Sequence, residues 1–331
     1  MTDEFSTRGT GIERSQSVMW AGTVRTLRLA DQVRAAALAG FGGISITPLG
    51  WSQALSEGIS SGDMRALCAD NGIERIHLDP FTRWSALWQP ANLDPAVFPL
   101  SFFAFDADDF LRIAEALGAA SMTAIATFPH GAIAQEQMTE DFARLCDRAA
   151  DHGLHCSLEF IPLDWGVPDL ETAWSIVRDA DRANSGIVLD TWCFQRSGSS
   201  LELLESIPGD RIDFVQLADG LARVPKNRSW VEDNLDNRLP PGLGAFPLDA
   251  ILSTLARTGG LGSVSPELFA WQLDQMTPEQ IADLSRSSLA ATADGAGIAH
   301  DLGPATPGWH TDFERAERGT SAVTAAPRSH L

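Results

Sequence analysis

The sequence contains no tyrosine, few basic residues for its size and no long hydrophobic run. Lys and Arg together number 24 against 44 Asp and Glu, so the formal net charge is −20. A chain this acidic repels the phosphate backbone of nucleic acids, and nucleic acid is therefore not an expected partner. No apolar stretch approaches the roughly 18 residues that a transmembrane helix needs, so no membrane partner is expected either.

Cysteine is also scarce and is not arranged for disulfide or metal chemistry of the usual kinds. Cys68, Cys146, Cys156 and Cys193 lie far apart and form no C-x-x-C pair. The first residues, MTDEFSTRGTGIERSQS, contain no apolar segment of the kind found in secretory leaders. Together these absences predict a reduced, cytoplasmic protein.

Short apolar runs alternate with amphipathic segments from residue 18 to about residue 295. The expected strands are 17–22, 42–47, 73–79, 122–128, 155–162, 187–193, 213–219 and 263–269. The expected helices are 27–39, 62–70, 106–117, 139–152, 170–182, 200–207, 247–258 and 278–291. Eight successive strand–helix units predict an α/β fold, a single-domain (β/α)8 TIM barrel over residues 17–298. No G-x-G-x-x-G follows the first strand, which argues against a dinucleotide-binding sheet.

Three segments fall outside this alternation. Residues 1–16 and 299–331 are rich in small and polar residues with little periodicity, which predicts flexible tails that are disordered or wrap the surface. The stretch 220–246 is longer than a usual loop between strand and helix. Because long loops at this end of a barrel are commonly functional, we expect it to form a mobile lid whose Arg238 touches the substrate.

Four side chains with oxygen ligands sit late in four consecutive expected strands. They are Glu159, Asp190, Gln216 and Glu267. In a TIM barrel such positions meet at the C-terminal face, and burying three carboxylates there costs several kcal/mol for each uncompensated charge. One divalent ion would satisfy them, with Mg2+ or Mn2+ favoured over Co2+ or Zn2+ by the all-oxygen ligand set. The alternative is that each acid separately caps a helix or pairs with an arginine.

A divalent ion chelated by adjacent carbonyl and hydroxyl oxygens stabilises an enolate or enediolate, so that a nearby base can remove the proton α to the carbonyl. Glu159 and Glu267 are expected to combine ligation with this proton transfer. His77 is a further catalytic candidate. Its alternative interpretation is a structural histidine whose ring nitrogens are already hydrogen-bonded.

Substrate contacts are expected from Arg196 and Arg238, because a guanidinium binds carboxylates, phosphates or vicinal hydroxyls through paired N–H groups. A surface ion pair is the alternative for each. Several of the ten tryptophans, Trp192 among them, fall at or after strand ends, where an indole can stack on a sugar or a flat ring. These residues favour a small polyhydroxy or cyclic ketone as substrate, with core packing as the alternative for any one indole.

The runs LEFIP, VLDTWCFQRSG, FVQLADG, RLPPGLGAFPL and VSPELF resemble the xylose isomerase-like barrel superfamily of sugar phosphate isomerases and epimerases. The resemblance covers most of residues 18–290 and is nearest to the branch of 3-dehydroshikimate dehydratase and inosose dehydratase. It implies metal ligation by Glu159, Asp190, Gln216 and Glu267. It also implies a divalent-metal-dependent isomerase, epimerase or dehydratase-type lyase that acts on a sugar or a cyclic hydroxy ketone.

The sequence departs from that family at three positions. Cys193 stands where the family usually has a histidine near the metal, Leu243 replaces the acid of a Pro-Gly-Glu-Gly turn, and Pro266 directly precedes Glu267. We expect Cys193 to contact substrate as a neutral, packed thiol. The departures leave open a second hypothesis, a catalytically degenerate barrel that serves as a binding or partner subunit. An endonuclease of the same superfamily would need more histidine ligands and a basic face. The oligomeric state stays open, with a homo-oligomer among the alternatives.

Overall fold

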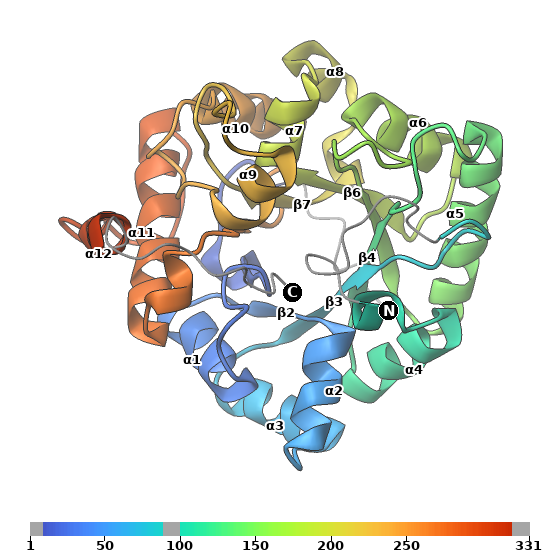
Figure 1. Ribbon diagram of the computed structural model, residues 1–331, viewed down its shortest axis with the longest axis horizontal. Coiled ribbons are helices and arrows are strands. Elements are labelled where there is room, and N and C mark those ends of the chain that lie inside the picture. Colours follow the sequence, from blue (N-terminus) through green and yellow to red (C-terminus); the bar gives the residue numbers. More distant parts are fainter. Residues whose placement is uncertain (1–8, 89–99, 320–331) are drawn as a thin grey trace.

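The computed structural model describes residues 9–88 and 100–319. Eight parallel strands form one sheet in sequence order, and helices surround it as an outer ring (Figure 1). This arrangement confirms the predicted single-domain TIM barrel. The strands are β1 (Val18–Met19), β2 (Gly43–Ile46), β3 (Arg75–Phe81), β4 (Ser121–Ile125), β5 (His155–Glu159), β6 (Ser185–Asp190), β7 (Ile212–Leu217) and β8 (Val264–Pro266).

All eight predicted helices are confirmed within a few residues of their expected ends. They are α1 (Leu29–Ala39), α3 (Ser61–Asp70), α4 (Ala107–Leu117), α5 (Gln135–Asp151), α6 (Leu170–Ala180), α8 (Leu201–Ser206), α10 (Leu248–Thr258) and α11 (Pro278–Ala296). Four more were not predicted: α2 (Pro48–Ser56), α7 (Thr191–Ser197), α9 (Trp230–Asp236) and α12 (Thr311–Gly319). Short 3-10 turns occupy Arg14–Gln16, Leu100–Phe103, Gly209–Arg211 and Leu273–Gln275.

Local signals in the sequence set several helix boundaries. Ser60 precedes α3, and its hydroxyl accepts the N–H of Asp63 in a reciprocal capping box. Thr277 begins α11 in the same way. Gly118 ends α4 with φ of 62°, a left-handed conformation that glycine adopts without a steric penalty.

The strands are buried on both faces, as a barrel requires. Every residue of β4 to β8 is buried, so polar side chains that face the barrel interior need partners there. His77 of β3 illustrates the rule, because its two ring nitrogens lie 2.7 Å from the hydroxyls of Ser121 and Thr123. Hydrogen-bonded polar groups therefore form part of the barrel core.

Side-chain hydroxyls bridge the seam where the last strand meets the first. The Ser17 hydroxyl donates to the carbonyl of Val264 over 2.8 Å. The Ser265 oxygen accepts the N–H of Val18 and the indole N–H of Trp20, at 3.2 and 2.9 Å. These contacts hold β8 beside β1 and so keep the strand ends around the barrel in register.

The long segment 220–246 is fastened to the barrel at both ends. The Asp219 carboxylate, directly after β7, accepts backbone N–H groups of Gly220, Gly242, Gly244 and Phe246. Between these attachments the chain forms α9, which lies near the end of β7 (Figure 1). The segment expected as a lid is thus anchored at both ends and carries its own helix, while its mobility stays a prediction.

Within the described residues, parts of the expected tails wrap the barrel surface. Gly9 donates its N–H to the carbonyl of Gly259, and Ile12 donates to that of Ala299. Helix α12 lies at the outer edge beside α11 (Figure 1) and buries Phe313. Residues 1–8 and 320–331 of the predicted tails lie outside the described residues.

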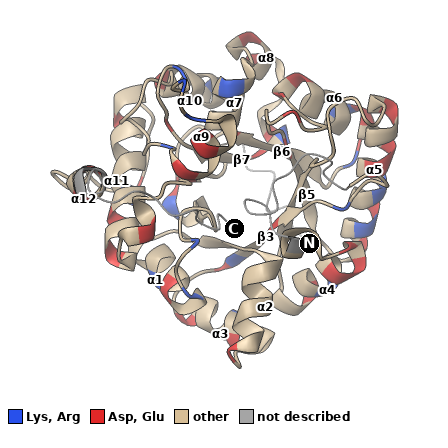
Figure 2. Ribbon diagram, in the orientation of Figure 1, with Lys and Arg blue, Asp and Glu red and all other residues tan. Residues whose placement is uncertain are grey.

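Charged side chains are distributed over the outer helices. Figure 2 shows Asp and Glu on most of them, with Lys and Arg at scattered positions between the acids. Among the described residues no helix is both long and apolar enough to cross a membrane.

The Asp219 contacts predict a stability effect. Asp219→Ala leaves four backbone donors without their acceptor, so we expect a loss of about 3 kcal/mol in the free energy of unfolding, measured by urea denaturation. Glu74→Ala, which removes an exposed acid, is the control and is expected to change stability by less than about 0.5 kcal/mol. Equal stability of the two variants would contradict the anchoring role of Asp219.

Candidate metal centre

The four expected ligand residues come to the same end of neighbouring strands. Glu159 and Asp190 are the last residues of β5 and β6, and Gln216 of β7 is the register partner of Asp190. Glu267 directly follows β8, and its N–H donates to the carbonyl of Leu217 over 3.0 Å. The C-terminal ends of β5 to β8 therefore carry three acids and one amide.

The acids are buried and close together. Ligand atoms of Glu159, Asp190 and Cys193 all lie within 4.8 Å of one another, and these three residues form the potential metal-binding group of the described chain. Asp190 also caps α7, because one of its oxygens accepts the N–H groups of Trp192 and Cys193. The capping bonds fix the Asp190 carboxylate and leave its second oxygen directed elsewhere.

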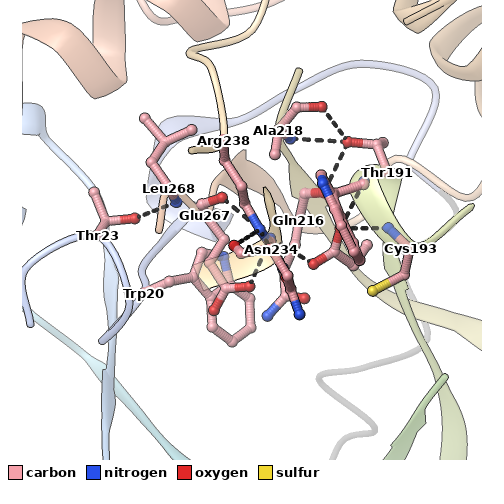
Figure 3. Close-up of polar contacts among 12 residues, drawn as sticks. Trp20, Thr23, Thr191, Cys193, Gln216, Ala218, Asn234, Arg238, Glu267 and Leu268 are labelled. Carbon is pink, nitrogen blue, oxygen red and sulfur yellow. Dashed lines mark hydrogen bonds and ion pairs between the residues drawn. The ribbon is translucent and has the colours of Figure 1, made fainter. Parts of the chain in front are cut away.

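That second oxygen contacts Arg238, the cation of the cluster. One terminal nitrogen of Arg238 lies 2.6 Å from Asp190 Oδ2 and 3.4 Å from Glu267 Oε2. The rest of the guanidinium donates to the carbonyl and side-chain oxygens of Asn234 in α9 (Figure 3). Arg238 is only 2% exposed and stacks over Phe269, 4.9 Å from the ring centre. Arg238 thus reaches the site from the loop 220–246 and contacts two of the expected ligands, Asp190 and Glu267.

One guanidinium does not neutralise this cluster. Burial raises the pKa of Glu159 well above its ordinary value, and the charges of Glu267, Asp190 and Asp79 raise it further. Burial likewise raises the pKa of Glu267, although Arg238 opposes the shift. Burial alone would lower the pKa of Arg238, but Asp190 and Glu267 raise it above its ordinary value. The site therefore favours added positive charge.

Gln216 supplies an independent sign that a ligand belongs here. Its amide nitrogen and oxygen are both buried and have no hydrogen-bond partner among the described residues. A buried amide without partners costs free energy, and such groups are normally satisfied by protein, water or an ion. Gln216 is the register partner of Asp190, and an amide oxygen is a ligand that divalent cations accept. Glu267 lies outside the group of ligand atoms within 4.8 Å of one another, so ligation by the set of Glu159, Asp190, Gln216 and Glu267 stays a prediction that rests on the oxygen chemistry of these side chains.

A fourth acid of the site escaped the sequence analysis. Asp79 lies in β3, two residues beyond His77 and therefore on the same face of the strand. It is buried, and its Oδ1 has no hydrogen-bond partner among the described residues. Burial raises the pKa of Asp79 to about 7, with a hydrogen bond from Thr123 opposing the shift. The same strand-end reasoning that selected Glu159 would have found it.

A cavity of about 290 Å³ opens beside the acids. Polar parts of its wall come from Asp79, Glu159, Arg238 and Glu267. Apolar parts include Ile46, Ile125, Ile161, Phe102, Trp165 and Phe269. The volume and this mixed wall suit a small ring-shaped organic molecule.

Trp192 and Arg196 are engaged by Asp233 of α9 and are not among the residues that line this cavity. The indole N–H of Trp192 donates to Asp233 over 3.0 Å, and Arg196 pairs with the same carboxylate at 2.8 Å. Their observed contacts attach α7 to α9. Substrate contact by either residue stays a prediction that these contacts do not support.

Cys193 is fully buried next to the acids. Burial raises the pKa of its thiol well above the ordinary value, and the charges of Asp190 and Glu159 raise it further. The thiol is therefore neutral in this environment. This agrees with the packed, uncharged role expected from the sequence, while direct substrate contact by Cys193 stays a prediction.

The structure does not bring His77 to the acid cluster. His77 lines a different, small pocket together with Asp213 and Phe214. Burial and the nearby His155 lower the pKa of His77 to about 3, so the ring is neutral. The contacts of His77 agree better with a structural histidine than with a catalytic one. His77 therefore has no part in the proposed chemistry.

Comparison with known proteins supports the same fold. Two curated relatives are the 3-dehydroshikimate dehydratase of Pseudomonas aeruginosa, 30% identical over 251 residues, and the inosose isomerase of Bacillus subtilis, 30% identical over 183 residues. The matches cover 73% and 54% of this chain, and 36% and 64% of the relatives. The chain therefore spans about a third of the length of that dehydratase.

Solved structures agree. The zinc-bound IOLI protein has a TM-score of 0.69 at 21% identity, covering 85% of this chain and 99% of that one. A fusion of a xylose isomerase-like TIM barrel with 4-hydroxyphenylpyruvate dioxygenase has a TM-score of 0.68 at 21% identity, covering 95% and 46%. At this identity the likeness concerns the fold. A family model described as xylose isomerase-like TIM barrel matches residues 33–291, and the chain belongs to that family.

Proposed function

We propose that the protein is a cytoplasmic, divalent-metal-dependent isomerase, epimerase or dehydratase of a small hydroxy ketone. The observation that carries the proposal is the buried group of Glu159, Asp190, Gln216 and Glu267. Its three acids outnumber the one guanidinium beside them, and the amide of Gln216 has no hydrogen-bond partner among the described residues. The curated relatives are a dehydratase and an isomerase, and the IOLI neighbour binds zinc. All four cysteines are free and buried, as suits a reducing compartment.

The metal would be held by these four side chains. An ion bound there would polarise the carbonyl of a chelated hydroxy ketone and make the neighbouring C–H more acidic. Mg2+ and Mn2+ suit the oxygen donors, and Zn2+ or Co2+ remain alternatives.

Glu159 and Glu267 are the proposed proton-transfer groups. They reach the cavity from opposite sides of the ligand set, since one ends β5 and the other follows β8. Their raised pKa values place each carboxyl closer to a neutral-pH proton donor or acceptor than an exposed glutamate. One can remove a proton while the other returns it, which serves isomerisation, epimerisation and loss of water alike.

Arg238 and Asn234 position these acids. Before a metal binds, Arg238 orders Asp190 and Glu267 from the loop side, and Asn234 holds the guanidinium in place. The apolar walls formed by Trp165 and Phe269 keep bulk water away from the reacting carbon. The retained acids and the unpartnered Gln216 favour an active enzyme over the degenerate barrel that Cys193 and Leu243 had left open.

Gln216 gives a sharp test of the metal site. Gln216→Met keeps the side-chain length but removes the amide, so we expect Mn2+ affinity, measured by calorimetry, to fall by about ten- to a hundredfold. The metal-free variant is expected to gain about 1 kcal/mol or more of stability, because a buried unpartnered amide is lost.

Asp190→Asn is the companion variant, since it keeps the helix cap through its remaining oxygen and removes one charged ligand. It should also weaken Mn2+ binding. Glu205→Gln, a change at an exposed position of α8, should bind Mn2+ like the parent. Parent-like affinity in both site variants would contradict the ligand assignment.

The reaction itself is tested by solvent exchange. With Mn2+ present in D2O, the protein is expected to exchange the proton α to the carbonyl of inosose for deuterium. Loss of that proton signal in the proton NMR spectrum measures the exchange. Glu159→Gln removes a proposed proton acceptor and should lower that rate by at least about a hundredfold, equivalent to roughly 2.7 kcal/mol.

Glu205→Gln serves again as the control and should exchange at the parent rate. Undiminished exchange in Glu159→Gln would exclude Glu159 as the base. Absence of exchange in the metal-loaded parent with both inosose and 3-dehydroshikimate would overturn the proposed function.

A further inference from the structure

Asp79 is a cavity-wall carboxylate that the proposed metal site does not use. It projects from β3, on the far side of the barrel from β7, whereas the proposed ligands come from β5 to β8. It lines the same cavity as Glu159 and Glu267, and its Oδ1 is buried without a partner among the described residues. A buried carboxyl oxygen in a cavity wall normally accepts a hydrogen bond. A ligand in the cavity could supply the donor that Asp79 Oδ1 lacks among the described residues.

The arginines of the cavity wall are already paired. Arg25 contacts Asp236 and Asp274, at 3.0 and 2.8 Å. Arg28 pairs with Glu57 at 3.1 Å. Every cation that the described residues contribute to this wall therefore has an acid of the protein as its partner, Arg238 included.

Arg238 has little to offer an anionic ligand. Its Nε and one terminal nitrogen donate to Asn234, and the other terminal nitrogen lies between Asp190 and Glu267. A metal ion that took over those two carboxylates would free the terminal nitrogen that now faces them, while the contacts to Asn234 stay. In this structure all three guanidinium nitrogens have protein partners, so a substrate carboxylate would have to displace one of them.

The charge balance of the wall points the same way. Asp79, Glu159 and Glu267 in the wall and Asp190 beside it are four acids, one more than the three positive charges of Arg238 and a bound divalent ion. A substrate anion would add to this excess in a buried site, where repulsion is weakly screened. A hydroxyl donor instead relieves it, because a carboxyl group binds a hydroxyl whether or not it carries a proton.

We propose that Asp79 binds a hydroxyl of the substrate and that this selects a neutral polyhydroxy ketone of the inosose type over a ketone that bears a carboxylate, such as 3-dehydroshikimate. The inference rests on the proposed function, whose metal site and proton transfer it takes as given. The apolar wall, including Ile125 and Trp165, packs against the C–H face of the ring. Asp79 is then a specificity residue, separate from the groups that transfer the proton.

The test compares two ketones on the Mn2+-loaded full chain. We expect inosose to react, by solvent exchange or product formation, with kcat/KM at least about tenfold above that for 3-dehydroshikimate. Asp79→Asn removes the charge and keeps the size, so it should lower this preference by about tenfold, partly by admitting the anion. Asp79→Leu removes hydrogen bonding as well and should raise KM for inosose by at least about tenfold with a smaller change in kcat.

Two controls separate specificity from damage to the fold. Asp141→Asn alters another buried acid, on α5 and away from the cavity wall, and should keep the parent preference. Mn2+ affinity within about threefold of the parent shows that the Asp79 variants retain the metal site.

The outcomes are distinct. A parent that prefers 3-dehydroshikimate, or an Asp79→Asn variant with an unchanged preference, overturns the inference and leaves the proposed function standing. If neither ketone exchanges a proton, the proposed function fails and the inference fails with it.

Discussion

The structure of this site depends on one electrostatic constraint, namely that several carboxylates are buried together with too little positive charge beside them. Glu159, Asp190 and Glu267 meet at the barrel end with Asp79 nearby, and the guanidinium of Arg238 contacts Asp190 and Glu267. Acids at the surface stay ionised in water without a loss of folding free energy. Here burial disfavours the charged form and so raises the pKa of both Glu159 and Glu267. A fold that keeps such a cluster destabilises itself unless a cation joins it, and this is why we regard the cluster as functional.

The surrounding loops are organised to hold that cluster still. Asp190 is fixed as the cap of α7, so its orientation follows from the strand–helix turn. Asp219 ties down both ends of the loop 220–246, and Asp233 connects α9 to α7 through Trp192 and Arg196. Arg238 reaches the acids from this tethered loop. Asp219 and Asp233 lie outside the site and therefore act on it indirectly. They fix the loop 220–246, which carries Arg238.

The sequence predicted much of the fold because local rules set most of it. The sequence shows eight alternations of apolar strand and amphipathic helix. Barrel geometry then predicts that acids at strand ends, such as Glu159, lie at the C-terminal face. Helix α7 was missed because TWCFQRS begins with Thr191 and contains the aromatic residues Trp192 and Phe194, all of which favour a strand that continues from β6. The partner of Arg196 lies 37 residues away, so its pairing with Asp233 depends on tertiary structure that no local pattern encodes. The contacts of His77 depend on tertiary structure in the same way, since its partners Ser121 and Thr123 belong to the next strand.

The central claim is that the buried cluster holds one divalent ion, and a crystal structure of Mn2+-loaded protein with anomalous data tests it most directly. The account predicts a single strong peak at the ends of β5 to β8, within roughly 2.0–2.4 Å of oxygens from Glu159, Asp190, Gln216 and Glu267. It also predicts that Arg238 moves away from Asp190 Oδ2. A map without a peak there, with Arg238 still paired to Asp190 and Glu267 at saturating Mn2+, would contradict the claim.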